Sequence, residues 1–367
     1  AAPATPAAAG RALVGAAADY CRLLRQSARG LYRDALLAGS PALRLHLALR
    51  RVADTLRREV AATQPGFGDP GFLGKLDEEM ARMRGREPPG FPNTQVFYGF
   101  MAQNVQTWRP AVERCCLRTF EAASTVAALL AEALVPQFPN LCRALTRLAE
   151  EAIDELQQGV LEEVDHMFVK ESEPYTTNES MLDLINKLRF QKFDQALVDS
   201  FGRLGQGDRT PEQMAAAVLT SMGRWYLDAH GVAANGNPAE MAILLQAYWN
   251  IATRRVIDNV CMTLEATFVA RLLNLLENRT FLLGSGGPGG GEEEAGVAEL
   301  FVEDEALARR RRALTEKRDR LQRALDFVNR AAPDVVAAPP PDRRPASAYA
   351  ADGRLATTAP RKGVAAY

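Results

Sequence analysis

Apolar side chains recur at steps of three and four residues along almost the whole chain, which is the period of an amphipathic α-helix. Runs that alternate apolar and polar residues, as a half-buried strand would, are missing from the sequence. The pattern therefore predicts an all-α fold. The clearest example is the face formed by Leu141, Leu145, Leu148, Ala152, Leu156, Val160 and Val164.

Glycine and proline clusters divide this pattern into long segments. Ser40 is expected to cap a helix that starts at Pro41, and Pro110 is expected to bend another. The segment 202–238 contains many glycines and is expected to be irregular. The predicted helices cover Ala12–Ala38, Pro41 to a Pro/Gly interruption at 65–71, Phe72–Arg84, Thr94–Leu134, Pro139–Val169, Asn178–Phe201, Ala239–Leu283 and Ala298–Arg330.

Helices of this length pack side by side, so we predict an elongated antiparallel four-helix stalk bundle. The helix at Ala298–Arg330 is expected to be separate, because the glycine-rich linker 284–291 precedes it. Its leucines are spaced by seven and form a narrow apolar seam, typical of a helix that docks beside others. A core helix of the chain's own bundle is the alternative. The seam consists of Leu300, Leu307, Leu314, Leu321 and Val328, with Leu325 between them.

Composition and charge narrow the function classes. The net charge is −1, and the single basic run Arg309–Arg312 is too small a footprint to predict nucleic-acid binding. Five cysteines without a CxxC pair indicate neither a zinc site nor a disulfide framework, so a reduced, cytoplasmic setting is expected. No run approaches about 18 apolar residues, so no membrane span is expected. A start at Ala1, without methionine or a targeting pattern, suggests a fragment.

Nothing in the sequence predicts catalysis. No GxxxxGK[ST] phosphate loop occurs, and Gly284–Gly291 lacks the lysine and precedes three glutamates. The matches to DxxG at Asp199–Gly202 and Asp228–Gly231 are interpreted as chance. The three histidines, at 46, 166 and 230, lie too far apart to form a helical metal pair. We therefore expect no catalytic, cofactor-binding or metal-binding residue, and no enzyme activity in this chain.

The segment Gly85–Asn93 (GREPPGFPN) joins two helical patterns and resembles a known signature. It is similar to the assembly loop in the stalk of dynamin-like large GTPases, the Mx proteins in particular, with Pro88 in place of the usual leucine. The second half resembles the GTPase effector region of that family. That similarity is carried by LLQAY at 244–248, RRV at 254–256 and LLNLL at 272–276.

This resemblance covers residues 20–331 and implies a division of the chain. GTP and Mg²⁺ are then expected only for a GTPase domain that this chain lacks, and a full-length form would be a GTPase. The implied parts are a disordered tail at 1–10, a middle (stalk) region at 11–201, a stalk-tip region at 202–238, a GTPase effector region at 239–331 and a disordered tail at 332–367.

The resemblance also implies interface residues. Gly85, Arg86 and Glu87 match the assembly loop, and the charged pair is the stronger interface candidate. Met167, Phe168 and Phe268 resemble positions of the central helix-face interface, with burial in the core as an equal alternative. The terminal helix corresponds to one that joins two helices flanking the GTPase domain.

The function implied is self-assembly as a homo-oligomer through the stalk and coupling to a GTPase domain. A lipid membrane or a microtubule is a partner by resemblance only, with a cytoplasmic, peripheral-membrane location. The tip region lacks the lysine run of Mx proteins, since only Arg203, Arg209 and Arg224 are basic there. Trp225 and Tyr226 could seat in a lipid interface or pack internally. A standalone helical scaffold or adaptor derived from such a stalk is the alternative function.

Overall fold

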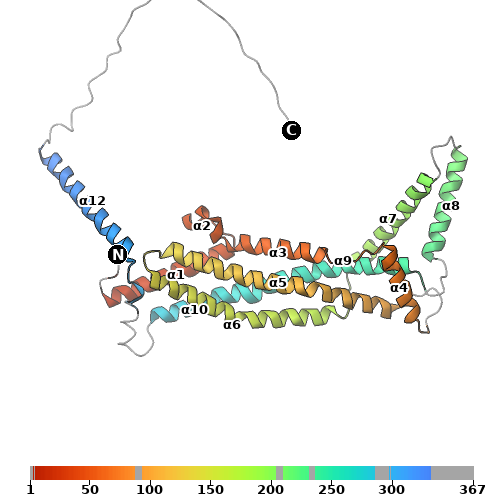
Figure 1. Ribbon diagram of the computed structural model, residues 1–367, viewed down its shortest axis with the longest axis horizontal. Helices are drawn as coiled ribbons and strands as arrows, with labels where there is room; N and C mark the ends of the chain where they lie inside the picture. The colour runs from red at the N-terminus through yellow and green to blue at the C-terminus, as the bar shows by residue number, and fades with distance from the viewer. Residues whose placement is uncertain are drawn as a thin grey trace, which may run out of the picture. The chain divides into compact units, whose positions relative to one another are not determined.

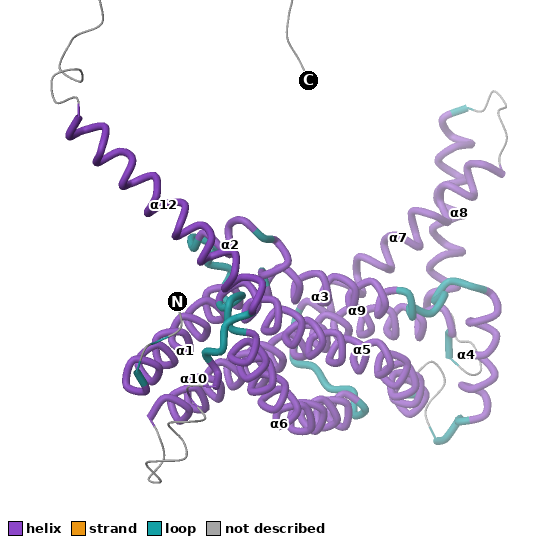
Figure 2. The backbone as a smooth tube through the Cα atoms, turned by 60° about the vertical axis from the view of Figure 1, so that its left-hand side comes forward, coloured by secondary structure: helices purple, strands orange, loops and turns teal. Residues whose placement is uncertain are grey.

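The computed structural model describes residues 3, 5–86, 93–203, 210–230, 236–285, 297 and 299–331. Among these residues the regular elements are all helical and no strand occurs, which confirms the all-α prediction (Figure 2). The chain divides into two compact units, Ala1–Asp304 and Glu305–Tyr367. No helix in the described part has the length and apolar character needed to cross a membrane.

The first unit is a bundle of long helices that lie side by side (Figure 1). The second unit holds one described helix, α12 (Glu305–Ala331). In chain order the first unit contains α1 (Pro6–Ala28), α2 (Ala35–Gly39), the 3-10 turn η1 (Pro41–Leu43), α3 (Leu45–Ala61), α4 (Pro70–Arg82), α5 (Thr94–Leu134), α6 (Pro139–Glu171), α7 (Ser180–Arg203), α8 (Pro211–His230), α9 (Pro238–Thr263), the π-helical segment η2 (Leu264–Val269) and α10 (Ala270–Ser285).

The bundle is assembled around α5, which has 41 residues and a length of about 62 Å. The helix continues through Pro110, so that proline does not end it. α6 returns along α5, α3 packs on α5, and α1 packs on α10. α9, η2 and α10 follow one another without a break and form the last member of the bundle.

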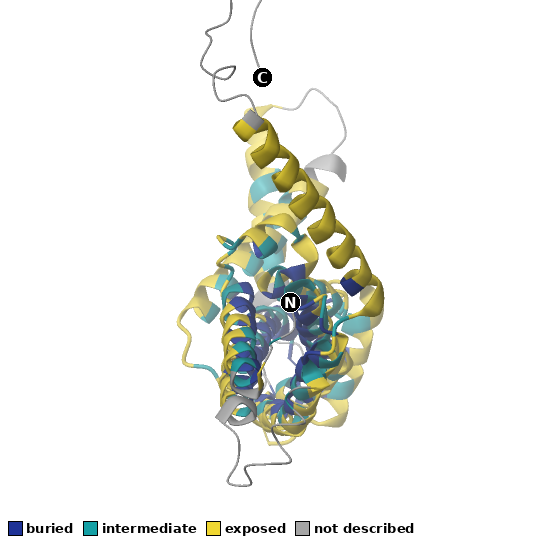
Figure 3. Ribbon diagram, turned by 90° about the vertical axis from the view of Figure 1, so that its left-hand side faces the viewer, coloured by how far each residue is buried: buried dark blue, intermediate teal, exposed yellow. Residues whose placement is uncertain are grey.

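The core lies between these helices, while the polar faces point outward (Figure 3). Trp108 of α5 meets Trp249 of α9 edge to face at 6.2 Å, and Phe120 of α5 meets Phe268 of η2 at 4.8 Å. Both phenylalanines and both tryptophans are almost fully buried. Each large apolar side chain buried in this way contributes roughly 1.5–3 kcal/mol, so the amphipathic faces hold the bundle together.

The predicted helix Ala12–Ala38 is two helices in the structure. α1 starts earlier, at Pro6, within the segment expected to be a disordered tail, and it ends at Ala28. Gly30 then adopts a left-handed backbone with φ of 71°, which favours glycine. The buried Ser27 hydroxyl donates to the Leu43 carbonyl at 2.5 Å and accepts from the Leu45 amide at 2.7 Å. This side chain therefore ties the end of α1 to the start of α3.

The segment 202–238, expected to be irregular, contains α8 over much of its length. Thr210 precedes the helix, and Pro211 occupies its first turn, where a missing N–H has no cost. α8 packs against α7 as a hairpin, with Trp225 edge to face on Phe193 at 5.0 Å. Residues 204–209 and 231–235 of this segment lie outside the described residues.

The predicted helix Ala298–Arg330 also differs from the observed one. Residues 301–304 are not helical, and α12 begins at Glu305. The glycine-rich linker lies outside the described residues from 286 onward, and its first two residues end α10. The tail at 332–367 also lies outside them.

Candidate assembly and coupling surfaces

Asn93 connects the two ends of the loop that resembles the stalk assembly signature. This side chain is 5% exposed, and its amide group donates to the Met83 carbonyl at 2.7 Å. Its oxygen accepts from the amides of Gln95 and Val96 and so caps α5. The last residue of GREPPGFPN therefore ties the end of α4 to the start of α5.

Two of the three predicted assembly residues in this loop can be placed. Gly85 and Arg86 lie directly after α4 and are exposed. Glu87 lies outside the described residues. An exposed arginine at the start of a loop that is tied down at both ends is available for contact with another molecule.

The three predicted helix-face residues lie in or against the core. Phe168 and Phe268 are both 0% exposed, and Met167 is half-buried against the same core. Phe168 lies beneath the guanidinium of Arg109, whose carbon is 4.8 Å from the ring centre. The two phenylalanines are therefore buried in the core, which was the alternative to a position in an interface.

Phe268 belongs to the π-helical segment η2 and packs in the core. The apolar periodicity of the sequence did not predict a π-helical segment here. π-helical turns insert one extra residue per turn and occur often at functional sites. The neighbouring Thr267 hydroxyl donates to a Glu163 carboxylate oxygen at 2.8 Å, which connects η2 with α6. The widened turn therefore places Phe268 and Thr267 against α5 and α6, respectively.

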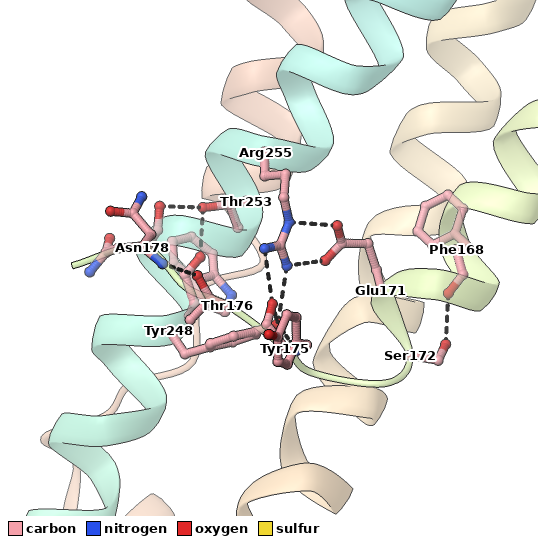
Figure 4. Close-up of polar contacts among 11 residues, drawn as sticks. Phe168, Glu171, Ser172, Tyr175, Thr176, Asn178, Tyr248, Thr253 and Arg255 are labelled. Carbon is pink, nitrogen blue, oxygen red and sulfur yellow. Dashed lines mark hydrogen bonds and ion pairs between the residues drawn. The ribbon is translucent and has the colours of Figure 1, made fainter. Parts of the chain in front are cut away.

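Arg255 of α9 forms a polar cluster that joins the end of α6 to α9 (Figure 4). Its Nε and Nη2 donate to the two Glu171 oxygens at 2.7 and 2.6 Å. Nη2 also donates to the Tyr248 hydroxyl at 3.0 Å, and Nη1 donates to the Tyr175 carbonyl at 3.2 Å. The Tyr175 amide donates to the Tyr248 hydroxyl at 3.0 Å.

This cluster carries a buried charge. Glu171 is only 6% exposed, and its hydrogen bonds with Arg255 raise the pKa of that guanidinium above its ordinary value. In the sequence, Arg255 stands out only as part of the RRV match at 254–256. Its partner Glu171 lies 84 residues earlier, and no local pattern links the two.

Grooves lie on both sides of this part of α9. One, of about 620 Å³, is lined among others by Tyr175, Asn178 and Arg254. A second, of about 520 Å³, lies between α3 and α9. Neither contains a catalytic constellation, and the described residues include no cluster of three or more potential metal ligands.

The cysteines are not nucleophiles in this environment. Burial raises the pKa of Cys115 and of Cys116 to about 12, and burial also raises the pKa of Cys261. A thiol with such a pKa is protonated at neutral pH and neither attacks electrophiles nor binds metals readily.

The predicted seam divides between the two units. Leu300 is not part of it, because this residue belongs to the first unit and packs against the bundle core. Next to it Phe301 is 4% exposed and meets Phe138 edge to face at 5.1 Å. Including Leu300 was therefore wrong: the helical pattern is broken at 301–304, and the anchoring residue Phe301 was missed.

The rest of the seam lies on α12 and is exposed. Each residue lies three, four or seven positions from the next, so all five share one face of the helix. Figure 3 shows α12 as exposed over most of its length, although Ala308 near its start is buried. The exposed fractions are 43% for Leu307, 58% for Leu314, 61% for Leu321, 53% for Leu325 and 56% for Val328.

The α7–α8 hairpin exposes a second set of apolar side chains. Among the tip residues named from the sequence, Trp225 is half-buried against Phe193, whereas Tyr226 is 60% exposed. Between Gln213 and Arg224 the helix carries no charged residue. The large exposed apolar residues of the hairpin are Leu182, Phe190, Val198, Met214, Leu219, Met222, Tyr226 and Leu227.

Comparison with known proteins finds similarity to a dynamin family and to Mx proteins. Residues 235–331 match the family described as Dynamin GTPase effector domain. The chain is 22% identical over 284 residues to the interferon-induced GTP-binding protein Mx2 of Oncorhynchus mykiss, an alignment that covers 76% of this chain and 42% of Mx2. It is 25% identical over 284 residues to Mx1 of the same fish, covering 76% of this chain and 41% of Mx1. The chain thus spans less than half the length of these relatives.

Proposed function

We propose that this dynamin-superfamily stalk and GTPase effector region assembles with copies of itself and couples that assembly to a GTPase domain through α12. The observation that carries the proposal is the exposed seam of α12, five apolar residues on one helix face. Apolar side chains at a seven-residue spacing are stabilised when another helix covers them. Helices that flank a GTPase domain are the partners that the family resemblance implies.

GTP hydrolysis belongs to the partner domain in this proposal. The trout relatives are named GTP-binding proteins, and this chain aligns with less than half of each. The present sequence has no phosphate loop to bind the nucleotide. The chain therefore acts as the lever and assembly element, and GTP and Mg²⁺ bind to the GTPase domain.

The proposal is tested by adding the purified chain to the GTPase domain of trout Mx2, prepared with its flanking helices but without its own stalk and effector region. We expect the chain to bind this domain and to change its rate of GTP hydrolysis. Leu321→Glu should abolish the effect, because it places a charge in the seam. Phe327→Glu is the matched control, since Phe327 is 73% exposed and lies on the other side of α12. No binding, or equal loss with both variants, would contradict the proposal and favour a standalone scaffold.

A second proposal concerns the α7–α8 hairpin, which is suited to a lipid surface. Eight large apolar side chains are exposed on these two helices, of which α7 packs on both α8 and α9. Exposed apolar patches of this kind mark interaction sites, and amphipathic helices can bury an apolar face at the boundary of a bilayer. Insertion of these apolar side chains into a bilayer would not require the lysine run that the tip region lacks.

Flotation with phosphatidylcholine vesicles tests this second proposal. The unchanged chain should float with the vesicles, and Leu219→Asp should reduce the bound fraction several-fold. Thr220→Asp is the matched control, because Thr220 is exposed and adjacent but not apolar. Failure of the unchanged chain to float would exclude this attachment.

A further inference from the structure

The acidic residues of α12 lie away from its leucine seam, whereas basic residues occur on both sides of the helix. The helix carries nine basic and four acidic residues. At about 100° per residue, Arg310, Lys317 and Arg318 lie within about 60° of the centre of the leucine seam. Arg311 lies at the edge of the same sector. All four acidic residues, Glu305, Glu316, Asp319 and Asp326, lie more than about 120° away from that centre.

The basic residues alternate with the leucines along the seam. Arg310 and Arg311 follow Leu307 at steps of three and four, and Lys317 and Arg318 follow Leu314 in the same way. These are the positions at which a helix dimer usually carries apolar residues or selects its partner by charge. The seam face of α12 therefore presents apolar and positive groups and no negative ones.

The geometry of the apolar residues favours a helix over a lipid surface as the occupant. The leucines at 307, 314 and 321 and the valine at 328 repeat strictly every seven residues. Together they span only about 60° of the helix circumference, whereas a helix lying in a bilayer interface needs a broad apolar face. Phe327, the aromatic residue of α12, points away from the seam by about 135°.

The same charges disfavour pairing of α12 with a second copy of itself. Two such faces in contact would bring arginines and lysines opposite one another, and like charges across a helix pair are destabilising. An occupant with carboxylates beside its apolar stripe would instead form ion pairs at each step. Ion pairs within α12, such as Arg318 with Asp319 at 2.8 Å, are exposed and weak enough to be exchanged.

We propose that the seam face of α12 recognises an acidic amphipathic helix, with Asp or Glu on both sides of the apolar stripe that covers the leucines. This inference rests on the proposed function, in which α12 docks with other helices, and it specifies the chemistry of that partner. Charge complementarity then selects the partner, and the seven-residue seam sets its register.

The experiment uses the full chain and two synthetic helical peptides of four heptads each. Both peptides carry the same leucine seam, with Glu in one and Lys in the other at the positions beside it. We expect the Glu peptide to bind at least about tenfold more tightly than the Lys peptide at low ionic strength. Each basic residue beside the seam attracts a glutamate and repels a lysine, and these individually weak effects add. The difference should narrow in high salt, where exposed charges are screened.

Two charge-reversed variants locate the effect on the seam face. Arg310→Glu with Lys317→Glu leaves two positive and two negative groups beside the seam and should abolish the preference for the Glu peptide. Arg312→Glu with Arg323→Glu makes the same change of charge on the opposite side and should leave the preference for the Glu peptide intact. Circular dichroism of both variants checks that α12 remains helical.

The outcomes separate this inference from the proposed function. Equal affinity for both peptides would overturn the inference while leaving helix docking in place. Stronger binding to vesicles of phosphatidylcholine with about a quarter phosphatidylserine than to either peptide, lost in the Arg310/Lys317 variant, would make lipid the occupant and also overturn it. Binding to neither peptide, with no effect on the Mx2 GTPase domain, would overturn both.

Discussion

The bundle and α12 have the same apolar periodicity and opposite exposure. Leu141 and Leu145 of α6 are 0% exposed, whereas Leu314 and Leu321 of α12 are 58% and 61% exposed. Both pairs lie on one face of a regular helix. The comparison teaches that periodicity identifies a helix and its apolar face but does not identify what covers that face.

The bundle and α12 also differ in the reach of their ion pairs. In the bundle, ion pairs connect distant elements, as Arg255 does with Glu171 and Arg114 with Glu59. On α12, local pairs join Arg309 to Glu305 and Arg318 to Asp319. The ion pairs of the bundle thus connect its helices, whereas these two pairs on α12 lie within a single helix.

The largest predicted effect on stability comes from placing an aspartate in the bundle core, and the same substitution on α12 is the comparison. Phe268→Asp should lower the free energy of unfolding by more than about 4 kcal/mol, because it leaves a cavity and an unpaired charge in the core. Leu321→Asp on α12 should change it by less than about 0.5 kcal/mol. Denaturant unfolding followed by circular dichroism measures both. A stable, folded Phe268→Asp protein would contradict the burial of this side chain.

The polar cluster should show the next largest effect. Arg255→Ala leaves Glu171 buried without its partner and should cost about 2–3 kcal/mol. The adjacent Arg254 is exposed, so Arg254→Ala should stay within about 0.5 kcal/mol. Equal effects in the same unfolding assay would show that the ion pair does not stabilise the junction of α6 and α9.

Alkaline pH should destabilise the bundle through its buried thiols. Burial raises the pKa of Cys115 and of Cys116 to about 12 in the folded state, from 9.0 in the exposed state. The folded state therefore holds these protons more tightly, and its stability falls as pH rises from about 9 to 12. The loss is up to about 1.4 kcal/mol per pH unit for each thiol. Replacing both cysteines by alanine should flatten the pH dependence of unfolding in this window; an unchanged slope would assign it to other groups.

The smallest effect on stability is predicted for the exposed assembly loop. Arg86→Asp should leave the free energy of unfolding within about 0.5 kcal/mol but lower the mass of the assemblies seen in sedimentation velocity. Arg51→Asp, also exposed on the bundle, is the matched control. Unchanged assemblies with Arg86→Asp would remove this residue from the interface.

The sequence predicted the regular part of the fold because that part follows from local rules. The helices at 94–134 and 139–169 were predicted to within a few residues, since their apolar faces continue over many turns. The hairpin helix α8 was missed because the glycines of 202–238 argue against a helix. Its apolar residues pack on α7 in the structure. The break at 301–304 was missed because Phe301 fits the helical period of the sequence. In the structure this side chain packs on Phe138 in the core.

The candidate surfaces were predictable only in part. Arg86 and the seam of α12 follow from a loop motif and a heptad, both of which are local patterns. The burial of Phe168 and Phe268 could not follow from them, because an apolar residue in a core and one in an interface have the same periodicity. The pairing of Glu171 with Arg255 joins residues far apart in sequence, which no local rule relates.

The sequence by itself determined that this chain is helical, that it lacks a phosphate loop, and that the seam face of α12 has apolar and basic residues but no acidic ones. Each of these is a property of composition and of the 3.6-residue turn. Only the tertiary structure decided which apolar faces are covered and where helices end. Burial and cross-helix ion pairs depend on which elements meet in space, and that choice is made by the packing of the whole bundle.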